Sequence, residues 1–386
     1  MADSDHGGDG EASARQTFAV DYRVHCNQLD VERIAQDLAV EQTLEFPADL
    51  ATEAVAGLML GRVEAIEAVG GNAFRVRMSY PFDTTAGELT QFLNVVFGNA
   101  SLLRDVRVEN IEIDPSLLGL PGPRFGIEGM RELLGVESRP LLATALKPMG
   151  LGAEALASLA YRVARGGIDI IKDDHGLTNQ HTAPFRERVS RCAEAVQKAN
   201  RETQKNSLYL ANVSADCDDL FERAEFARQA GAGGLLVAPG LVGFSGFAKL
   251  ASRDDIALPM MSHPAFSGGW LASERAGIDH RVLLGTLQRL VGADMVVFPH
   301  ASGRFPFSLE DCKRAAHGLA EPQRGLRPAL AVPAGGMTLD RVPELWDIYG
   351  SNVVLLIGGD LFRRGPDMED NARQFLRVVE RRSPTN

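Results

Sequence analysis

The 386-residue chain has little cysteine, no long apolar run and no basic cluster, and each shortage excludes a class of protein. Its four cysteines form no Cys-x-x-Cys pair, which argues against a zinc site and for reduced thiols in a cytoplasmic protein. No apolar run is long enough to span a bilayer, so we expect no membrane partner. The net charge is −11 with both signs mixed along the chain, which argues against a nucleic-acid partner.

The first third of the chain reads as a small α+β domain. Residues 1–16 are polar, glycine-containing and without the apolar core of a signal peptide, and we predict a disordered tail. Residues 17–122 then show a β-α-β-β-α-β order, with the expected elements at 18–24, after Asp30, and at 56–69, 74–78, 88–97 and 106–113. This order predicts a ferredoxin-like domain.

The remainder of the chain, residues 123–386, follows a connector rich in proline, glycine and leucine at 115–123. Eight short apolar runs alternate there with helical segments: 141–146, 168–171, 208–213, 234–237, 257–261, 295–298, 329–332 and 353–357. Eight runs over roughly 250 residues have the size and rhythm of a (β/α)8 TIM barrel. A doubly wound open sheet is the alternative, and the lack of Gly-x-Gly-x-x-Gly after the first run counts against it.

The run at 168–171 leads directly into Lys172-Asp173-Asp174-His175, the most informative stretch of the chain. Alternate residues of a strand share a face, so we expect Lys172 and Asp174 to point the same way. In a barrel of parallel strands, chemistry takes place at the carboxyl ends of the strands. A solvated charge cluster at the start of a loop is the alternative, and the residues at the other strand ends weigh against it.

Polar residues and glycines also follow the other runs, among them Lys147, His263 and Arg304. A lone histidine is more often structural, but the place of His263 after run five favours catalysis. Arg304 is equally compatible with a surface arginine and an anion clamp. Gly335-Gly336 and Gly358-Gly359 follow runs seven and eight, where loops commonly bind phosphate through backbone N–H groups; two tight turns are the alternative.

These segments resemble the large subunit of ribulose-bisphosphate carboxylase (RuBisCO), and nearly the whole chain after the tail resembles a RuBisCO-like protein, a form IV relative of that subunit. Residues 139–148 resemble the family's first barrel strand, 166–174 its metal-site segment and 262–266 its histidine segment after strand five. The two Gly-Gly pairs resemble its phosphate loops. The resemblance implies a TIM barrel preceded by an N-terminal ferredoxin-like α+β domain.

The resemblance also implies a Mg²⁺ site in which Lys172 is carbamylated by CO2 and Asp174 is the second ligand. A carbamate supplies the oxygen and negative charge that a hard cation requires. His175 stands where the family has a glutamate as third ligand. Because imidazole suits softer divalent metals, either the site shifts toward a metal such as Mn²⁺ or His175 leaves the shell and water replaces it.

Further roles follow from the same resemblance. Lys147, Lys172 and His263 are expected to be catalytic, with Lys147 as general acid or base. The residues expected to bind the substrate and its phosphate are His300, Arg304, Gly335, Gly336, Gly358 and Gly359.

Two residues of the N-terminal domain, Glu41 and Asn99, match family residues that complete the active site of the partner subunit. The resemblance therefore implies a homodimer or a higher homo-oligomer.

The chain departs from true carboxylases at several positions. A carboxylase has a second lysine where this chain has Met149, and the loop at 300–307 lacks the lysine that orients CO2. Ala334 stands where the family has a serine, and Pro264 where it has an arginine. We therefore predict that the chain keeps the enolising machinery and has lost CO2 fixation.

The predicted function is that of a non-carboxylating enzyme that forms a metal-stabilised enolate of a phosphorylated ketose or keto-sugar acid. The missing lysines favour a decarboxylase of the 3-oxo-isoapionate 4-phosphate type, since a leaving carboxylate needs no CO2-orienting lysine. The alternative is a 5-methylthioribulose-1-phosphate isomerase or 2,3-diketo-5-methylthiopentyl-1-phosphate enolase, with Met149, Phe266 and Phe305 as an apolar slot for the thioether. A non-catalytic binding or regulatory protein is the alternative of another class, and the retained lysines argue against it.

Overall fold

The computed structural model describes residues 16–323 and 325–382, so the predicted tail, apart from Gln16, lies outside the described residues. The chain separates into two compact units, with the division between Ile113 and Asp114. The sequence placed this division after residue 122. In the structure the connector starts with a 3-10 turn, Pro115–Leu118, that is assigned to the second unit.

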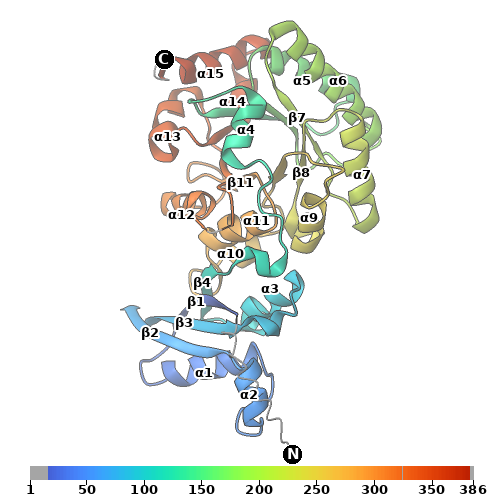
Figure 1. The fold of residues 1–386 in the computed structure, drawn as a ribbon. Coiled ribbons are helices and arrows are strands. Elements are labelled where there is room, and N and C mark those ends of the chain that lie inside the picture. The colour runs from blue at the N-terminus through green and yellow to red at the C-terminus, as the bar shows by residue number, and fades with distance from the viewer. Residues whose placement is uncertain (1–15, 324, 383–386) are drawn as a thin grey trace, which may run out of the picture. The chain divides into compact units, whose positions relative to one another are not determined.

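In the first unit, antiparallel pairing gives the strand order β4-β1-β3-β2. The elements are β1 (Thr17–His25), α1 (Val31–Glu41), α2 (Glu53–Met59), β2 (Arg62–Gly70), β3 (Ala73–Pro81), α3 (Leu89–Phe97) and β4 (Val106–Glu112). The alternating apolar residues of β1 are buried, and Tyr22 Oη donates a 2.6 Å hydrogen bond to the carbonyl of Val96 in α3. This is the predicted ferredoxin-like order, and Figure 1 shows its strands in blue and cyan.

The first unit differs from the sequence prediction in one element. The β-compatible stretch expected at 56–69 begins with helix α2, and strand β2 starts only at Arg62. The helix starts because Thr52 is its N-cap and accepts a 3.3 Å hydrogen bond from the Val55 N–H. The sequence prediction considered only the apolar residues of this stretch and therefore missed the helix N-cap at Thr52.

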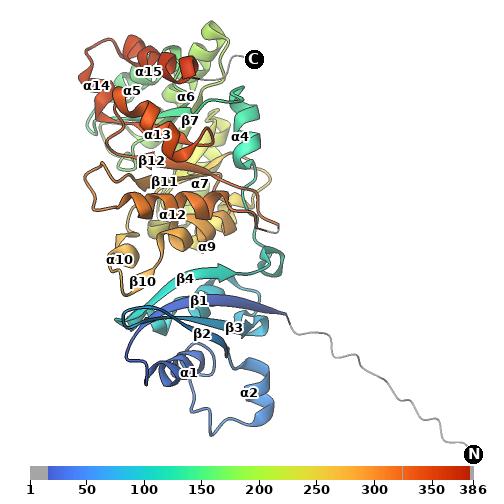
Figure 2. The same cartoon turned by 90° about the vertical axis from the view of Figure 1, so that its left-hand side faces the viewer.

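In the second unit, eight parallel strands close into a barrel in the order β11-β12-β13-β5-β6-β7-β8-β9. They are β5 (Leu141–Leu146), β6 (Ile170–Asp173), β7 (Leu208–Asn212), β8 (Gly234–Val237), β9 (Met260–Ser262), β11 (Met295–Pro299), β12 (Leu330–Ala334) and β13 (Val354–Ile357). All eight predicted runs are therefore strands of the barrel. Figure 2 shows β11 and β12 with helices α12 and α13 outside them.

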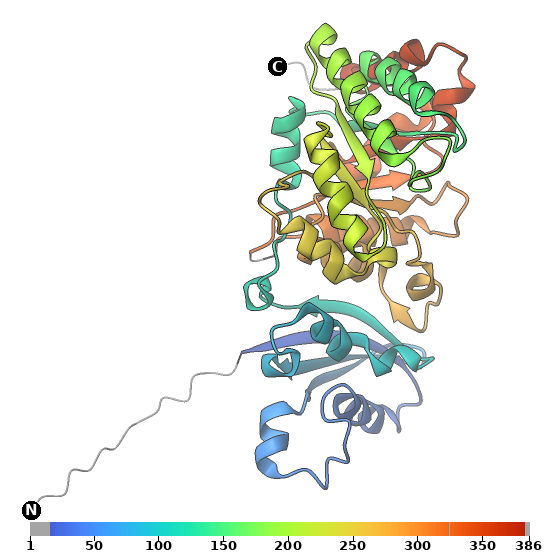
Figure 3. The same ribbon diagram turned by 90° about the vertical axis from the view of Figure 1, so that its right-hand side faces the viewer.

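The helices of this unit are mostly amphipathic and lie outside the strands; Figure 3 shows those of residues 185–230 in green to yellow-green along the outside. They are α4 (Gly126–Leu134), α5 (Ala153–Arg165), α6 (Phe185–Thr203), α7 (Cys217–Gln229), α8 (Pro239–Val242), α9 (Phe244–Ala251), α10 (Gly268–Leu271), α11 (Leu287–Leu290), α12 (Leu309–Ala320), α13 (Val342–Tyr349), α14 (Gly359–Arg363) and α15 (Met368–Arg382). A two-residue strand, β10 (Gly277–Ile278), and a π-helical turn, Val282–Thr286, lie between α10 and α11.

Apolar side chains fill the inside of the barrel, as expected for parallel strands covered on their outer face. Leu141, Ala143 and Ile170 belong to this interior cluster, together with residues of the other strands. Because Ile170 faces inward, Lys172 and Asp174 continue the inward-facing side of β6 toward its carboxyl end. Among the residues that the structure describes, none of the helices has the length and apolar character needed to cross a bilayer.

Candidate active site

Lys147 and Asp174 form an ion pair just beyond the carboxyl ends of the neighbouring strands β5 and β6. The Lys147 Nζ lies 3.1 Å from the Asp174 Oδ1. Strands β5 and β6 pair in parallel with Leu146 opposite Asp173, so each side chain leaves its strand at the same level. The structure thus brings together two residues that the sequence placed at one end of the barrel.

Lys172 lies in β6 and is only 2% exposed. Its Nζ donates a 3.0 Å hydrogen bond to the carbonyl of Asp173. Burial lowers the pKa of Lys172 to about 8; Asp174 and Asp173 oppose this shift, and the charge of Lys147 adds to it. A fraction of the amine is therefore neutral near pH 8, and the neutral amine is the form that can react with CO2.

Asp174 is the carboxylate of this cluster. Partial burial alone would raise the pKa of Asp174, but the nearby His175 ring and the charges of Lys172 and Lys147 together lower it below its ordinary value. The carboxylate is therefore ionised throughout the physiological range. It is the one negative charge among these converging groups, which makes it the natural partner for a cation.

His263 reaches the same point from the end of β9. Its ring stacks on that of His175, with centroids 4.3 Å apart and planes 12° apart. Burial lowers the pKa of His263 to about 2, helped by the charges of Lys172, His175 and Lys147 and opposed by Asp174. The ring is therefore neutral, and its Nδ1 accepts a 3.1 Å hydrogen bond from the Ala265 N–H. The remaining proton must be on Nε2, which makes that nitrogen a hydrogen-bond donor.

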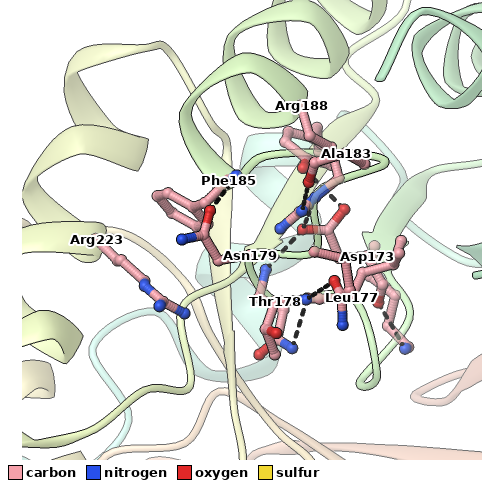
Figure 4. Close-up of polar contacts among 12 residues, drawn as sticks. Asp173, Leu177, Thr178, Asn179, Ala183, Phe185, Arg188 and Arg223 are labelled. Carbon is pink, nitrogen blue, oxygen red and sulfur yellow. Dashed lines mark hydrogen bonds and ion pairs between the residues drawn. The ribbon is translucent and has the colours of Figure 1, made fainter. Parts of the chain in front are cut away.

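Asp173, the neighbour of these residues, points out of the barrel toward helix α6. Its carboxylate accepts hydrogen bonds from Arg188 Nε (3.2 Å), Tyr209 Oη (2.9 Å) and the Asn212 N–H (3.0 Å). Arg188 and Asp173 are both 0% exposed, and Figure 4 shows them in contact. This fully buried pair attaches the end of β6 to α6.

The loop after β6, residues 174–184, is held by hydrogen bonds along its length. Asn212 Nδ2 donates to the carbonyls of His175 (2.9 Å) and Leu177 (3.0 Å). The Asn179 Oδ1 accepts a 2.8 Å bond from the Phe185 N–H, and Arg188 Nη1 donates to the carbonyl of Ala183, also at 2.8 Å (Figure 4). The backbone that carries Asp174 and His175 is thus fixed by its neighbours.

His300, after β11, lies at the other side of the barrel mouth and is 1% exposed. Its Nδ1 accepts a 3.2 Å hydrogen bond from the Ser302 N–H and lies 2.9 Å from Ser302 Oγ. Its Nε2 is buried without a hydrogen-bond partner among the described residues. Burial and the charge of Arg341 lower the pKa of His300, against the opposing effect of Glu344. The neutral ring therefore has a free Nε2–H donor.

The glycines after β12 and β13 differ in their surroundings. Gly335 and Gly336 have φ angles of 99° and 68°, and a Cβ on Gly336 would lie 2.3 Å from Ser302 Oγ. These two positions therefore require glycine, because the loop after β11 packs against them. Gly358 and Gly359 have nothing within 4 Å of an added Cβ, so open space surrounds them.

Sequence reasoning missed two residues on this side, Ser302 and Arg341. Ser302 fixes the His300 ring. Arg341 Nη1 donates a 3.4 Å hydrogen bond to the carbonyl of Gly336. The Nε and Nη2 of Arg341 donate to the carboxylate of Glu344. The Arg-x-x-Glu spacing of Arg341 and Glu344 in a helical segment was a signal for Arg341.

The predicted Arg304 is exposed, and its guanidinium lies 5.8 Å from the Phe305 ring.

Glu41 and Asn99, the two predicted residues of the first unit, lie together. Asn99 Nδ2 donates a 2.8 Å hydrogen bond to Glu41 Oε1, and both side chains are exposed. They come from the end of α1 and the turn after α3, 58 positions apart in the sequence.

A parallel (β/α)8 barrel with lysines, a carboxylate and histidines at the carboxyl ends of its strands is the arrangement of a barrel enzyme. The family model of the ribulose bisphosphate carboxylase large chain, catalytic domain, matches residues 126–305. A RuBisCO-like protein 1 of Rhodopseudomonas palustris is 38% identical over 366 residues, which are 94% of this chain and 98% of that relative. The chain belongs to the RuBisCO large-chain family and, within it, to the RuBisCO-like proteins.

Two further relatives have names that describe an activity. A 5-methylthioribulose-1-phosphate isomerase of Rhodospirillum rubrum is 38% identical over 93% of this chain and 95% of its own length. A 2,3-diketo-5-methylthiopentyl-1-phosphate enolase of Geobacillus kaustophilus is 32% identical over 93% and 91%. These names support the isomerase and enolase alternative better than the decarboxylase that the sequence reading preferred.

Solved structures agree with the fold. The crystal structure of a RuBisCO-like protein from Rhodopseudomonas palustris matches with a TM-score of 0.87 and 35% identity, over 97% of this chain and all of that one. An octameric ribulose-1,5-bisphosphate carboxylase/oxygenase from Pyrococcus horikoshii matches with a TM-score of 0.87 and 26% identity, over 95% and 88%.

Proposed function

We propose that this chain is an enolising enzyme of phosphorylated methylthio-sugars, acting as a 5-methylthioribulose-1-phosphate isomerase or a 2,3-diketo-5-methylthiopentyl-1-phosphate enolase. The observation that carries this proposal is the convergence of Lys147, Lys172, Asp174 and His263 at one end of the barrel. Such a cluster can remove a proton from a carbon next to a carbonyl and return it elsewhere. The names of the relatives support the choice of substrate.

The cluster fits a divalent cation such as Mg²⁺ on the condition that Lys172 is carbamylated. As amines, Lys172 and Lys147 are unsuitable ligands, and the described residues contain no group of three histidine, cysteine, aspartate or glutamate side chains that could hold a metal ion. A carbamate on Lys172 would add an oxygen donor beside Asp174, and the lowered pKa of Lys172 favours its formation. When bound, the cation would polarise the substrate carbonyl.

Lys147 and His263 would handle the protons and the substrate oxygens. The Lys147 side chain is 42% exposed, so substrate can reach its Nζ at the barrel mouth. His263 would donate its Nε2–H to a substrate oxygen, because the Ala265 N–H occupies Nδ1. Lys147 would accept or donate the proton at the carbon.

The substrate phosphate would lie on the opposite side of the mouth, among the glycines after β12 and β13. Gly358 and Gly359 leave open space for it, and Gly335 and Gly336 adopt the positive φ angles typical of anion-binding loops. The Nε2–H of His300 is buried in the structure, so it would reach a phosphate oxygen only after a loop movement that uncovers it. Arg304, which is exposed in the loop after β11, could add a positive charge at the entrance.

Apolar side chains in the loops after β5, β9 and β11 support a thioether substrate. Met149 is 54% exposed and lies against the loop at Gly176. If Gly176 carried a Cβ, that atom would be 2.7 Å from the Met149 Cε and 3.9 Å from the Asp174 Oδ2. Met149 therefore covers the loop beside the carboxylate. Phe266 and Phe305, after β9 and β11, are 79% and 55% exposed. A methylthio group would find more apolar surface here than a sugar acid would need.

The first unit would complete the site of a partner subunit through Glu41 and Asn99, as the family resemblance implies. The 2.8 Å hydrogen bond between them supports a joint role. We therefore propose a homodimer or a larger assembly.

The proposal is tested by proton exchange. 5-Methylthioribulose 1-phosphate, 2,3-diketo-5-methylthiopentyl 1-phosphate and 3-oxo-isoapionate 4-phosphate are incubated separately in D2O with enzyme, bicarbonate and either Mg²⁺ or Mn²⁺. The products are analysed by NMR after the metal has been removed. We expect deuterium at the carbon next to the carbonyl and isomerised product from a methylthio substrate, lost in Lys172→Ala and kept in the exposed-lysine control Lys313→Ala. Faster loss of CO2 from the oxo acid would favour the decarboxylase, and no turnover of any substrate would favour a binding protein.

A further inference from the structure

His175 is held in the site cluster from two sides. Its carbonyl accepts a 2.9 Å hydrogen bond from Asn212 Nδ2, which fixes the backbone. Its ring stacks on His263, whose own backbone N–H donates a 2.9 Å bond to the carbonyl of Val237 and whose Nδ1 is bonded to Ala265. A half-exposed histidine at the start of a loop would otherwise be free to turn into solvent. Here the ring plane is set beside the carboxylate.

The ring presents its Nδ1 to Asp174. The distance from His175 Nδ1 to Asp174 Oδ1 is 3.7 Å. Two ligands of one ion, each bound at about 2.1 Å, are separated by roughly 3.0–3.4 Å in octahedral or tetrahedral geometry. A small movement of either side chain therefore allows both atoms to bind the same ion. The Lys147 Nζ, which lies 3.1 Å from the Asp174 Oδ1, would have to move away.

We infer that His175 is a nitrogen ligand of the metal ion and that this chain prefers a transition-metal ion such as Mn²⁺ or Co²⁺ to Mg²⁺. The inference rests on the proposed metal-dependent function and specifies its metal. Imidazole nitrogen binds first-row transition metals well, whereas Mg²⁺ prefers an all-oxygen shell. One nitrogen beside the oxygens of Asp174 and of a Lys172 carbamate therefore shifts selectivity away from Mg²⁺.

The test compares metal affinities without reference to turnover. Mg²⁺ and Mn²⁺ are titrated calorimetrically into the full-length protein in bicarbonate buffer. The variants are His175→Glu, which restores an oxygen ligand, and His175→Gln. The matched control is His181→Glu, which makes the same change at an exposed histidine of the same loop. We expect the preference for Mn²⁺ over Mg²⁺ to fall by about tenfold or more in His175→Glu and to stay unchanged in the control.

A spectroscopic readout distinguishes ligation from a general effect on the fold. Pulsed EPR of bound Mn²⁺ should show coupling to an imidazole nitrogen in the wild type and in His181→Glu, and none in His175→Gln. Binding of both ions without nitrogen coupling, or with the same selectivity in wild type and His175→Glu, would overturn this inference and leave the proposed function standing. Binding of neither ion by the wild type would overturn both.

Discussion

Two adjacent aspartates at the end of β6 have opposite environments. Asp173 faces α6, is 0% exposed and is paired with Arg188, and burial raises its pKa against the effect of its partners. Asp174 faces the barrel mouth, its side chain is 20% exposed, and its pKa is lowered by His175 and the two lysines. One strand end thus carries a fully buried, paired carboxylate on its outer side and a partly exposed one at the barrel mouth on its inner side.

The difference lies in where the charge partners come from. Arg188 belongs to a neighbouring helix and is itself fully buried, so the pair has no access to substrate. Lys147 and His175 are 42% and 50% exposed at the side chain, so the partners of Asp174 can exchange with an incoming ion or substrate. Changes on the inner side should therefore affect chemistry, and changes on the outer side should affect stability.

The largest effect is expected at Lys172. Lys172→Ala should reduce turnover to background, because it removes the buried amine that would carry the carbamate oxygen ligand. Lys172→Arg should be equally inactive, since a guanidinium forms no carbamate and is not a metal ligand. Steady-state assays on the preferred methylthio substrate measure this, with Lys313→Arg as the control. Near-native activity of either variant would rule out the carbamate model.

A second prediction extends the comparison to the first unit. A mixture of inactive Lys172→Ala and inactive Asn99→Ala subunits should regain activity after subunit exchange if each site uses both chains. In a mixed dimer one site receives both wild-type residues, so roughly a quarter of all sites should recover at equal, random mixing. The assay is turnover against mixing ratio. No recovery despite demonstrated exchange would mean that each site is built within one chain.

A third prediction concerns carboxylation. The chain should not fix CO2 onto ribulose 1,5-bisphosphate, because Met149 and the loop after β11 provide no ammonium group for the CO2. Incubation with labelled bicarbonate measures this, and label in phosphoglycerate at an appreciable rate would contradict it.

The inner side of β6 could be predicted from the sequence, whereas the outer side could not. Alternate residues of a strand point to the same face, and Lys172 directly follows an apolar run; both are local properties of the chain. The pairing of Asp173 with Arg188 depends on how α6 packs on the strand, which no local pattern reveals. The contact between Ser302 and His300 and the packing of the β11 loop on Gly336 likewise depend on loop conformations formed only in the folded barrel.

A fourth prediction concerns the outer side of the strand. Arg188→Met leaves the Asp173 carboxylate buried without its charged partner, and the free energy of unfolding should fall by about 3–5 kcal/mol. The turnover number of the folded fraction should change little. Chemical denaturation measures the loss, and Arg191→Met, which removes an exposed pair on the same helix, should cost about 1 kcal/mol or less. A loss from Arg188→Met as small as that of the control would refute the structural role of the pair.

The smallest effect concerns the stability cost of Lys172 itself. Its folded-state pKa, about 8, is below the ordinary value of 10.5, so the fold binds this proton more weakly than the unfolded chain does. The cost to stability is therefore complete below pH 8 and fades as the pH rises toward 10.5. Lys172→Met removes it, and in CO2-free buffer at pH 7 the free energy of unfolding should rise by about 3 kcal/mol. Urea denaturation between pH 7 and 10.5 should show this gain shrinking with pH, with no such trend in Lys313→Met. A pH-independent difference, or a less stable Lys172→Met at pH 7, would show that burial of the amine is not what lowers the stability of this strand end.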